Sequence, residues 1–203
     1  MTIYLLSWDQ AMCDEWKRKF GPPVIVVLSS FQAFMKEHHN IDGVVSPANC
    51  FGMMDGSYDA AITEVFGEAL MKDVQKKLVL EYCGIQPLAS CISIPIRNAL
   101  TEGGRQIYLL HTPVMTTPSE VREPELIYHA MRNTMMEAIR LNLECVVFPA
   151  WGGHVGCVEP YIIAGYMYAA YEQILKPNNS ISWALIDETA GILYKQEHPN
   201  SVI

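Results

Sequence analysis

The sequence lacks any long run of apolar residues. No stretch approaches the roughly 18–20 uninterrupted apolar residues that cross a membrane, and no basic region precedes an apolar one at the start. Basic residues are also scarce, since 14 Lys and Arg stand against 22 Asp and Glu for a net charge of -8. We therefore expect no membrane partner and no binding to a nucleic-acid backbone.

Cysteines at metal-site spacing are missing as well. The six cysteines include no Cys-x-x-Cys pair, which argues against a zinc site. A chain of 203 residues, 50% of them hydrophobic, builds a core without disulfides. We expect reduced thiols, no bound metal and no cofactor, in an intracellular protein of the cytoplasm or nucleus. The length fits one domain over residues 1–203.

Short apolar segments alternate with helical ones along the chain. Strands are predicted over 3–6, 24–28, 43–45, 89–94, 107–111, 145–148 and 182–186. Helices are predicted over 14–20, 31–38, 60–66, 68–80, 124–141 and 159–175. The strands are apolar on both faces, which is typical of a sheet that is covered by helices on both sides. The pattern therefore predicts an α/β fold.

Two predicted strands end in glycine-containing loops that lead into helices. Val45 runs into residues 46–57, and Phe148 runs into residues 149–156. In such sheets ligands bind outside the carboxyl ends of the strands. Glycines let backbone N–H groups approach an anion, and a helix N-terminus adds partial positive charge, so two facing loops would suit a diphosphate. Neither loop has the glycine pattern of a Rossmann dehydrogenase or a P-loop enzyme.

Three segments, taken in order, resemble the macrodomain family. They are VVSPANCFGMMDGSYDAAI (44–62), IYLLHTP (107–113) and VVFPAWGGHVG (146–156), and the resemblance covers roughly residues 40 to 175. The Ser-Pro-Ala-Asn variant looks closest to the branch that includes ADP-ribose-1″-phosphate phosphatases. The resemblance implies a three-layer α/β/α domain with a mixed sheet that binds ADP-ribose or a close derivative.

The resemblance also implies an activity, hydrolysis at the distal ribose, with ADP-ribose 1″-phosphate as the leading substrate. Two alternatives share the same cleft. One is a reader that binds ADP-ribose without catalysis, and the other is a hydrolase of ADP-ribosyl groups or of O-acetyl-ADP-ribose. ADP-ribosylated proteins are then implied partners.

Residue roles follow from the same resemblance. Asn49 would bond the distal ribose, Asp59 would orient or deprotonate water, and His111 would act as an acid or orienter. Implied substrate contacts in the first loop are Ala48, Asn49, Phe51, Gly52, Asp55, Gly56 and Ser57. Those in the second loop are Trp151, Gly152, Gly153, His154, Val155 and Gly156.

Simpler structural roles compete with these assignments. Asn49 could bond its own backbone in a turn, Asp59 could cap a helix, and His111 could be a core histidine. Phe51 and Trp151 could belong to the core instead of stacking on a ligand.

Two positions depart from the family pattern. Asp55-Gly56-Ser57 stands where the family has three glycines, which places a carboxylate near a proposed phosphate. The family's adenine-binding Asp has no counterpart at 28–30, and Asp9 is a candidate substitute.

Overall fold

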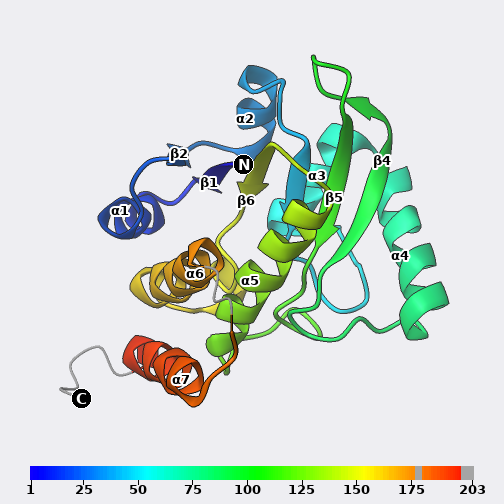
Figure 1. Ribbon diagram of the computed structural model, residues 1–203. Coiled ribbons are helices and arrows are strands. Elements are labelled where there is room, and N and C mark those ends of the chain that lie inside the picture. Colours follow the sequence, from blue (N-terminus) through cyan, green and yellow to red (C-terminus); the bar gives the residue numbers. More distant parts are fainter. Residues whose placement is uncertain (177–179, 198–203) are drawn as a thin grey trace.

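The computed structural model describes residues 1–176 and 180–197. In this part of the chain six strands form one sheet in the order β2-β1-β6-β3-β5-β4 (Figure 1). They are β1 (Thr2–Ser7), β2 (Val24–Leu28), β3 (Gly43–Ser46), β4 (Ile92–Leu100), β5 (Gln106–His111) and β6 (Cys145–Phe148). Neighbouring strands are parallel except β4 and β5, which are antiparallel. The mixed sheet confirms the predicted fold class.

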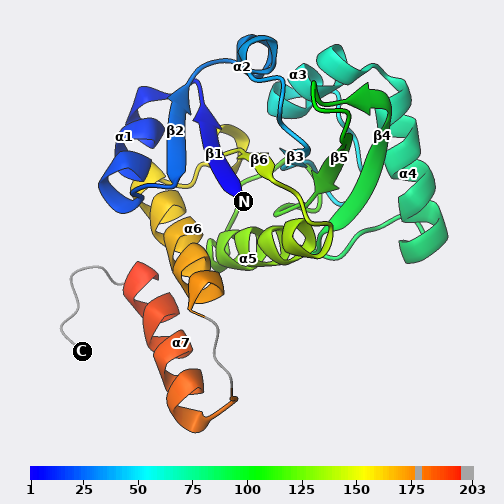
Figure 2. The same ribbon diagram turned by 45° about the horizontal axis from the view of Figure 1, so that its top comes forward.

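Helices cover both faces of the sheet. They are α1 (Gln10–Lys19), α2 (Phe31–Glu37), α3 (Ser57–Phe66), α4 (Ala69–Tyr82), α5 (Glu125–Arg140) and α6 (Pro160–Leu175), whereas α7 (Trp183–Glu197) packs against α6. One core cluster joins α1, α5 and α6 to the sheet, and another joins α2, α3 and α4 to its opposite face (Figure 2). Among the described residues, no helix has the length and apolar character needed to cross a membrane.

The segment 182–186 was predicted to be a strand, and this prediction is wrong. It opens helix α7, which contacts α6 through the bond from Gln173 Nε2 to Thr189 Oγ1, 3.2 Å long. Strand β6 is already paired on both sides, with β1 and with β3. A short apolar run is compatible with either a strand or a helix. Here the residues that follow it favour a helix, because several of them have high helix propensity.

Two other boundaries differ from the prediction. Helix α1 begins at Gln10 because the Asp9 carboxylate accepts a hydrogen bond from the N–H of Ala11 and caps the helix. Strand β4 extends to Leu100, past Pro95. A proline is tolerated there because β4 lies at the edge of the sheet, where, among the described strands, one of its sides has no partner.

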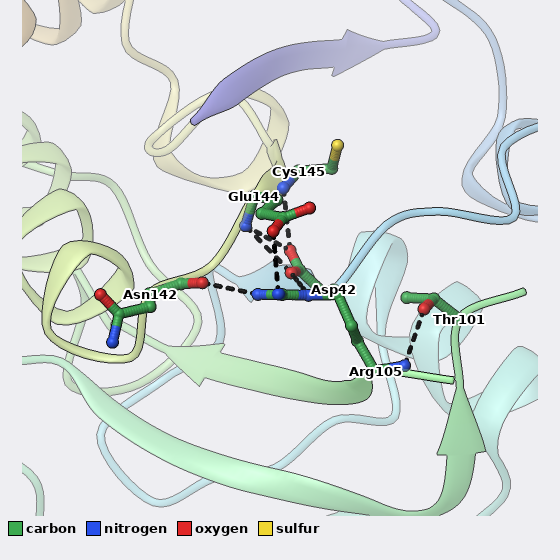
Figure 3. A network of polar contacts seen from close by, with 6 residues as sticks. All are labelled: Asp42, Thr101, Arg105, Asn142, Glu144 and Cys145. Carbon is green, nitrogen blue, oxygen red and sulfur yellow. Dashed lines mark hydrogen bonds and ion pairs between the residues drawn. The ribbon is translucent and has the colours of Figure 1, made fainter. Parts of the chain in front are cut away.

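A buried carboxylate holds together the amino ends of β3 and β6 (Figure 3). Asp42 is 0% exposed and accepts hydrogen bonds from the N–H of Glu144 (2.9 Å), the N–H of Cys145 (2.9 Å) and Arg105 Nε (2.8 Å). Arg105 also donates to the carbonyl of Asn142 at 2.6 Å and to Glu144 Oε1 at 2.9 Å. The network lies at the sheet end opposite to the glycine-containing loops, which follow the carboxyl ends of the same strands.

Candidate functional site

A cavity of about 1200 Å³ lies at the carboxyl ends of β1, β3 and β6. Its wall is built from the β1–α1 turn, the β3–α3 loop and the β6–α6 loop, with Met115 and Pro118 added from the segment after β5. This is the place where open α/β sheets bind ligands. Both loops that were selected from the sequence therefore meet at one site.

The predicted residues divide between the cavity wall and its surroundings. From the first loop, Ala48, Asn49, Asp55, Gly56 and Ser57 line the cavity, and from the second loop Gly152, Gly153, His154 and Val155 do so. Phe51, Gly52, Trp151, Gly156 and His111 are not part of the wall.

Trp151 was predicted to touch the ligand, and its position contradicts this. Its side chain is 0% exposed, packs edge-on against Phe148 and donates from Nε1 to the carbonyl of Thr112 at 2.9 Å. The indole therefore belongs to the core beneath the second loop. Phe51 is 40% exposed, but it is not among the residues that line the cavity.

Gly52 and Gly156 lie outside the cavity wall, where they allow the two loops to pack closely against the core. Gly52 has φ +66°, and a Cβ there would lie 2.8 Å from Val74 Cγ1. A Cβ on Gly156 would lie 2.9 Å from Val121 Cγ2. Glycine is needed at both positions because the backbone packs directly against apolar side chains.

Asn49 lines the cavity and also holds its own loop together. Its Nδ2 donates to the carbonyl of Met53 at 3.1 Å, and its Oδ1 accepts from the N–H of Phe51 at 3.1 Å. The turn role considered from the sequence is thus present. The amide is 7% exposed, so a ligand would meet one edge of it.

Asp59 lies in the first turn of α3 rather than at its cap, which is Gly56. The carboxylate is 7% exposed, lines the cavity and accepts a hydrogen bond from Ser46 Oγ at 2.5 Å. Burial raises the pKa of Asp59 from 3.8 to about 7, and the bond from Ser46 only partly offsets this. A carboxyl group with this pKa can release and accept protons near neutral pH.

His111 was predicted to act as a catalytic acid or as an orienter, and its position does not fit the role of an acid. The ring is 0% exposed, outside the cavity wall, and burial lowers its pKa to about 3, so it is neutral at pH 7. Nδ1 lies 2.6 Å from Gln86 Oε1. Because Gln86 Nε2 donates to the carbonyls of Ser90 and His111, its oxygen faces the ring and Nδ1 carries the proton.

Asp59 and His111 are expected to make opposing contributions to the pH dependence of stability. The raised pKa of Asp59 stabilises the fold at low pH, and this contribution is lost as the pH rises from 3.8 to about 7. The lowered pKa of His111 stabilises the fold above pH 6.5, and this contribution is lost as the pH falls toward about 3.

The Asp59→Asn variant should therefore lose stability more steeply than the wild type between about pH 6.5 and about pH 4, because only the histidine contribution remains. Urea denaturation at several pH values measures this. Equal slopes for the two proteins would contradict the assigned protonation states.

Several residues of the cavity wall were not predicted from the sequence. Trp8, Tyr58 and Glu159 line the cavity, and so does Asp9, which had been considered only as an adenine contact. The signal for Trp8 was its place directly after a strand that leads into a helix. That signal becomes useful only once β1 is known to lie beside β6.

The charge of the wall is one-sided. Asp9, Asp55, Asp59 and Glu159 line the cavity, and no Lys or Arg is among its lining residues. Any anionic ligand would therefore be held by backbone N–H groups and the N-terminus of α3, where no described side chain caps the helix. Within the described ranges, no group of three or more His, Cys, Asp or Glu residues is arranged to hold a metal ion.

The sequence profile of the Macro domain family matches residues 45–167, which is more than half of the chain. The chain therefore belongs to the Macro domain family. A search of curated proteins gives no match.

Solved structures share the fold at low sequence identity. A macrodomain of Oceanobacillus iheyensis with ADP has 17% identity and a TM-score of 0.60, covering 84% of this chain and 90% of that chain. The macrodomain of Mycobacterium tuberculosis DarG has 13% identity and a TM-score of 0.55, covering 66% of this chain and 84% of that chain.

Proposed function

We propose that the cavity binds ADP-ribose or a close derivative, and that the protein hydrolyses a bond at the distal ribose. The observation that carries this proposal is Asp59, a buried carboxyl group in the cavity wall with a pKa of about 7. Membership in the Macro domain family supports the choice of ligand. So do the Oceanobacillus iheyensis macrodomain structures with ADP and, for a variant of that protein, with ADPR.

The diphosphate would lie between the two loops. Residues 55–57, at the N-terminus of α3, and residues 152–155 all line the cavity. Backbone N–H groups and the helix dipole would hold the phosphates, which is how a site without Lys or Arg can bind an anion. Asn49 would contact the distal ribose through the exposed edge of its amide.

In the hydrolytic step, Asp59 would take a proton from the attacking water. This requires the ionised form of Asp59, so the rate of the step should increase as the pH rises through about 7. His111 would be a positioning residue, since it lies beside Ser46 across the β3–β5 pairing and Ser46 bonds Asp59. A group on the substrate itself or a water molecule would protonate the leaving oxygen.

The charge of the wall favours one class of substrate over another. A 1″-phosphate would add negative charge to a wall with four carboxyl groups, and its transfer needs donors for the phosphoryl oxygens. An acyl or protein-linked group at the distal ribose adds no such charge. Hydrolysis of O-acetyl-ADP-ribose or of ADP-ribosyl groups on proteins is therefore the reaction this wall favours, and ADP-ribose 1″-phosphate is the second candidate.

Two measurements test this proposal. Calorimetry with ADP-ribose tests binding, and absence of binding at millimolar ligand would contradict the shared cleft. Product release from O-acetyl-ADP-ribose, an ADP-ribosylated protein and ADP-ribose 1″-phosphate then separates the substrates. Binding without turnover of any of the three would identify a reader instead of an enzyme.

The Asp55→Asn variant is expected to bind ADP-ribose more tightly than the wild type. Asp55 is an exposed residue of the cavity wall in the first loop, where its charge would repel a phosphate. Removing an exposed charge of this kind should raise the affinity by about 2- to 5-fold. The same change at Asp187, an exposed residue of α7 outside the wall, is the control and should leave the affinity unchanged. Equal affinities for Asp55→Asn and wild type would argue that no phosphate lies near this position.

A further inference from the structure

The last residue of β3, Ser46, places a buried hydroxyl group between two titratable side chains. Ser46 is 0% exposed, and its Oγ donates to Asp59 Oδ1 at 2.5 Å. In the parallel pairing of β3 with β5, Ser46 is the direct partner of His111. Ser46 therefore connects a carboxyl group of the cavity wall with a histidine of the core behind it.

The side chains of Ser46 and His111 point to the same face of the sheet. Successive side chains of a strand alternate between the two faces, and paired residues of neighbouring strands share a face. Val44 and its β5 partner belong to the core cluster that includes α3, and Val45 and its β5 partner belong to the cluster on the opposite face. Ser46 and His111 come next in both strands, so both face α3, the helix that carries Asp59.

One ring nitrogen of His111 is an acceptor without a donor. Nδ1 carries a proton and donates it to Gln86 Oε1, as the two bonds donated by Gln86 Nε2 require. Nε2 of this neutral ring therefore has only a lone pair. Nε2 is buried, and no residue in the described part of the chain donates a hydrogen bond to it. A buried acceptor of this kind is costly, and the Ser46 hydroxyl is a donor on the neighbouring strand.

The Ser46 hydroxyl has a single proton, so it serves one acceptor at a time. Hydrogen bonds to a charged group are stronger than those between neutral groups, so an ionised Asp59 is the preferred acceptor. The bond from Ser46 Oγ to Asp59 Oδ1 corresponds to this state. Once Asp59 has taken a proton, its charge is gone and its own O–H becomes a donor.

We propose that Ser46 is a positioning residue whose hydroxyl donates to Asp59 while the carboxylate is ionised, and turns to Nε2 of His111 when Asp59 is protonated. Its effect on the rate rests on the proposed function. The proton of the attacking water passes to Asp59, the new carboxyl O–H donates to Ser46 Oγ, and the Ser46 O–H rotates toward Nε2 without breaking. His111 receives no proton and stays neutral. The protonated state thereby gains a bond that the ionised state lacks, which favours proton uptake from water.

Two substitutions should move the pH profile of kcat in opposite directions. Ser46→Ala removes the donor that stabilises the ionised form of Asp59, so the rise of kcat should move from about 7 to higher pH, by about 1 pH unit. His111→Phe removes the acceptor that stabilises the protonated form, so the rise should move to lower pH, by about 0.5 pH units. A loss of structure alone would lower kcat at every pH without moving the profile.

Ser93→Ala is the matched control for these variants. It removes a hydroxyl that donates to Glu137 from the opposite face of the sheet, and it should leave the profile unchanged. The other titratable residues of the cavity wall are the same in all three variants, namely Asp9, Asp55, Tyr58, His154, Cys157 and Glu159.

Nitrogen NMR of the ligand-free protein tests the change of acceptor directly. As the pH falls through the titration of the Asp59 carboxyl carbon, the ¹⁵N resonance of His111 Nε2 should move to lower frequency, because a hydrogen bond shields an unprotonated ring nitrogen. In Ser46→Ala this step should shrink to the small part that the charge of Asp59 causes by itself. His111→Phe lacks the signal and therefore assigns it.

The outcomes separate this inference from the function on which its effect on the rate rests. A His111 signal that stays fixed while Asp59 titrates, or that moves equally in Ser46→Ala, would overturn the role of Ser46 and leave the proposed function standing. An unmoved pH profile in a folded Ser46→Ala variant would overturn it as well. If the wild type hydrolyses nothing, the proposed function fails, and the spectra, which need neither ligand nor turnover, still decide whether Ser46 changes its acceptor.

Discussion

Replacing Asp59 with Asn is expected to lower kcat for hydrolysis at the distal ribose by about 100- to 10,000-fold, the usual contribution of a positioned general base. Asn has the same size and can still accept the hydrogen bond from Ser46 Oγ, but its amide cannot take a proton from water. The affinity for ADP-ribose should stay within a few fold, because the backbone of both loops is unchanged.

The pH profile makes this prediction specific. In the wild type, kcat should rise with pH through about 7, because the raised pKa keeps Asp59 protonated and inactive at lower pH. Asp59→Asn should lose this rise. Glu64→Gln, on the same helix but exposed and bonded to Gln32, is the control and should keep both the rate and the profile. A wild-type rate in Asp59→Asn would remove Asp59 from the mechanism.

Replacing Asp42 with Ala is expected to lower the free energy of unfolding by about 2–5 kcal/mol, because a buried carboxylate that accepts two backbone hydrogen bonds and pairs with the half-exposed Arg105 is lost. The variant leaves the N–H groups of Glu144 and Cys145 without their acceptor, and it leaves Arg105 without its buried partner. Buried donors without acceptors are costly because water cannot replace the lost bond.

Urea denaturation measures the loss, and two further variants locate its origin. Asp42→Asn keeps an oxygen that can accept one of the backbone bonds, so it should cost less than Asp42→Ala. Glu144→Gln removes only the exposed contact to Arg105 and should cost less than about 1 kcal/mol. A change below about 1 kcal/mol for Asp42→Ala would show that the network is dispensable.

ADP-ribose binding offers an independent check on Asp42→Ala. The network lies at the amino ends of β3 and β6, and the cavity lies at the carboxyl ends of the sheet. At a temperature well below the unfolding transition, the variant should therefore keep the affinity of the wild type.

The fold class and the position of the site follow from local pattern. Apolar strands such as β3 and β6 predict a covered sheet, and the loops after Val45 and Phe148 predict a site at its carboxyl end. Both features depend on short stretches of the chain, in which the composition of a strand and the glycines that follow it already carry the information.

Burial and strand order cannot be predicted from local sequence patterns in the same way, because they depend on residues that are far apart in the sequence. Whether Asp59, His111 or Trp151 faces a cavity or the core is decided by what packs against each side chain. The raised pKa of Asp59, the neutral state of His111 and the core position of Trp151 all follow from that packing.

Strand order also decided which segments reach the site. The sequence gives no reason to place β1 beside β6, yet this pairing brings Trp8 to the cavity and leaves β6 without a free side for residues 182–186. Sequence alone thus determined an α/β macrodomain fold with a loop-built site at the strand ends. The tertiary structure decided which side chains form its wall and which carry a proton, because long-range packing sets both exposure and pKa.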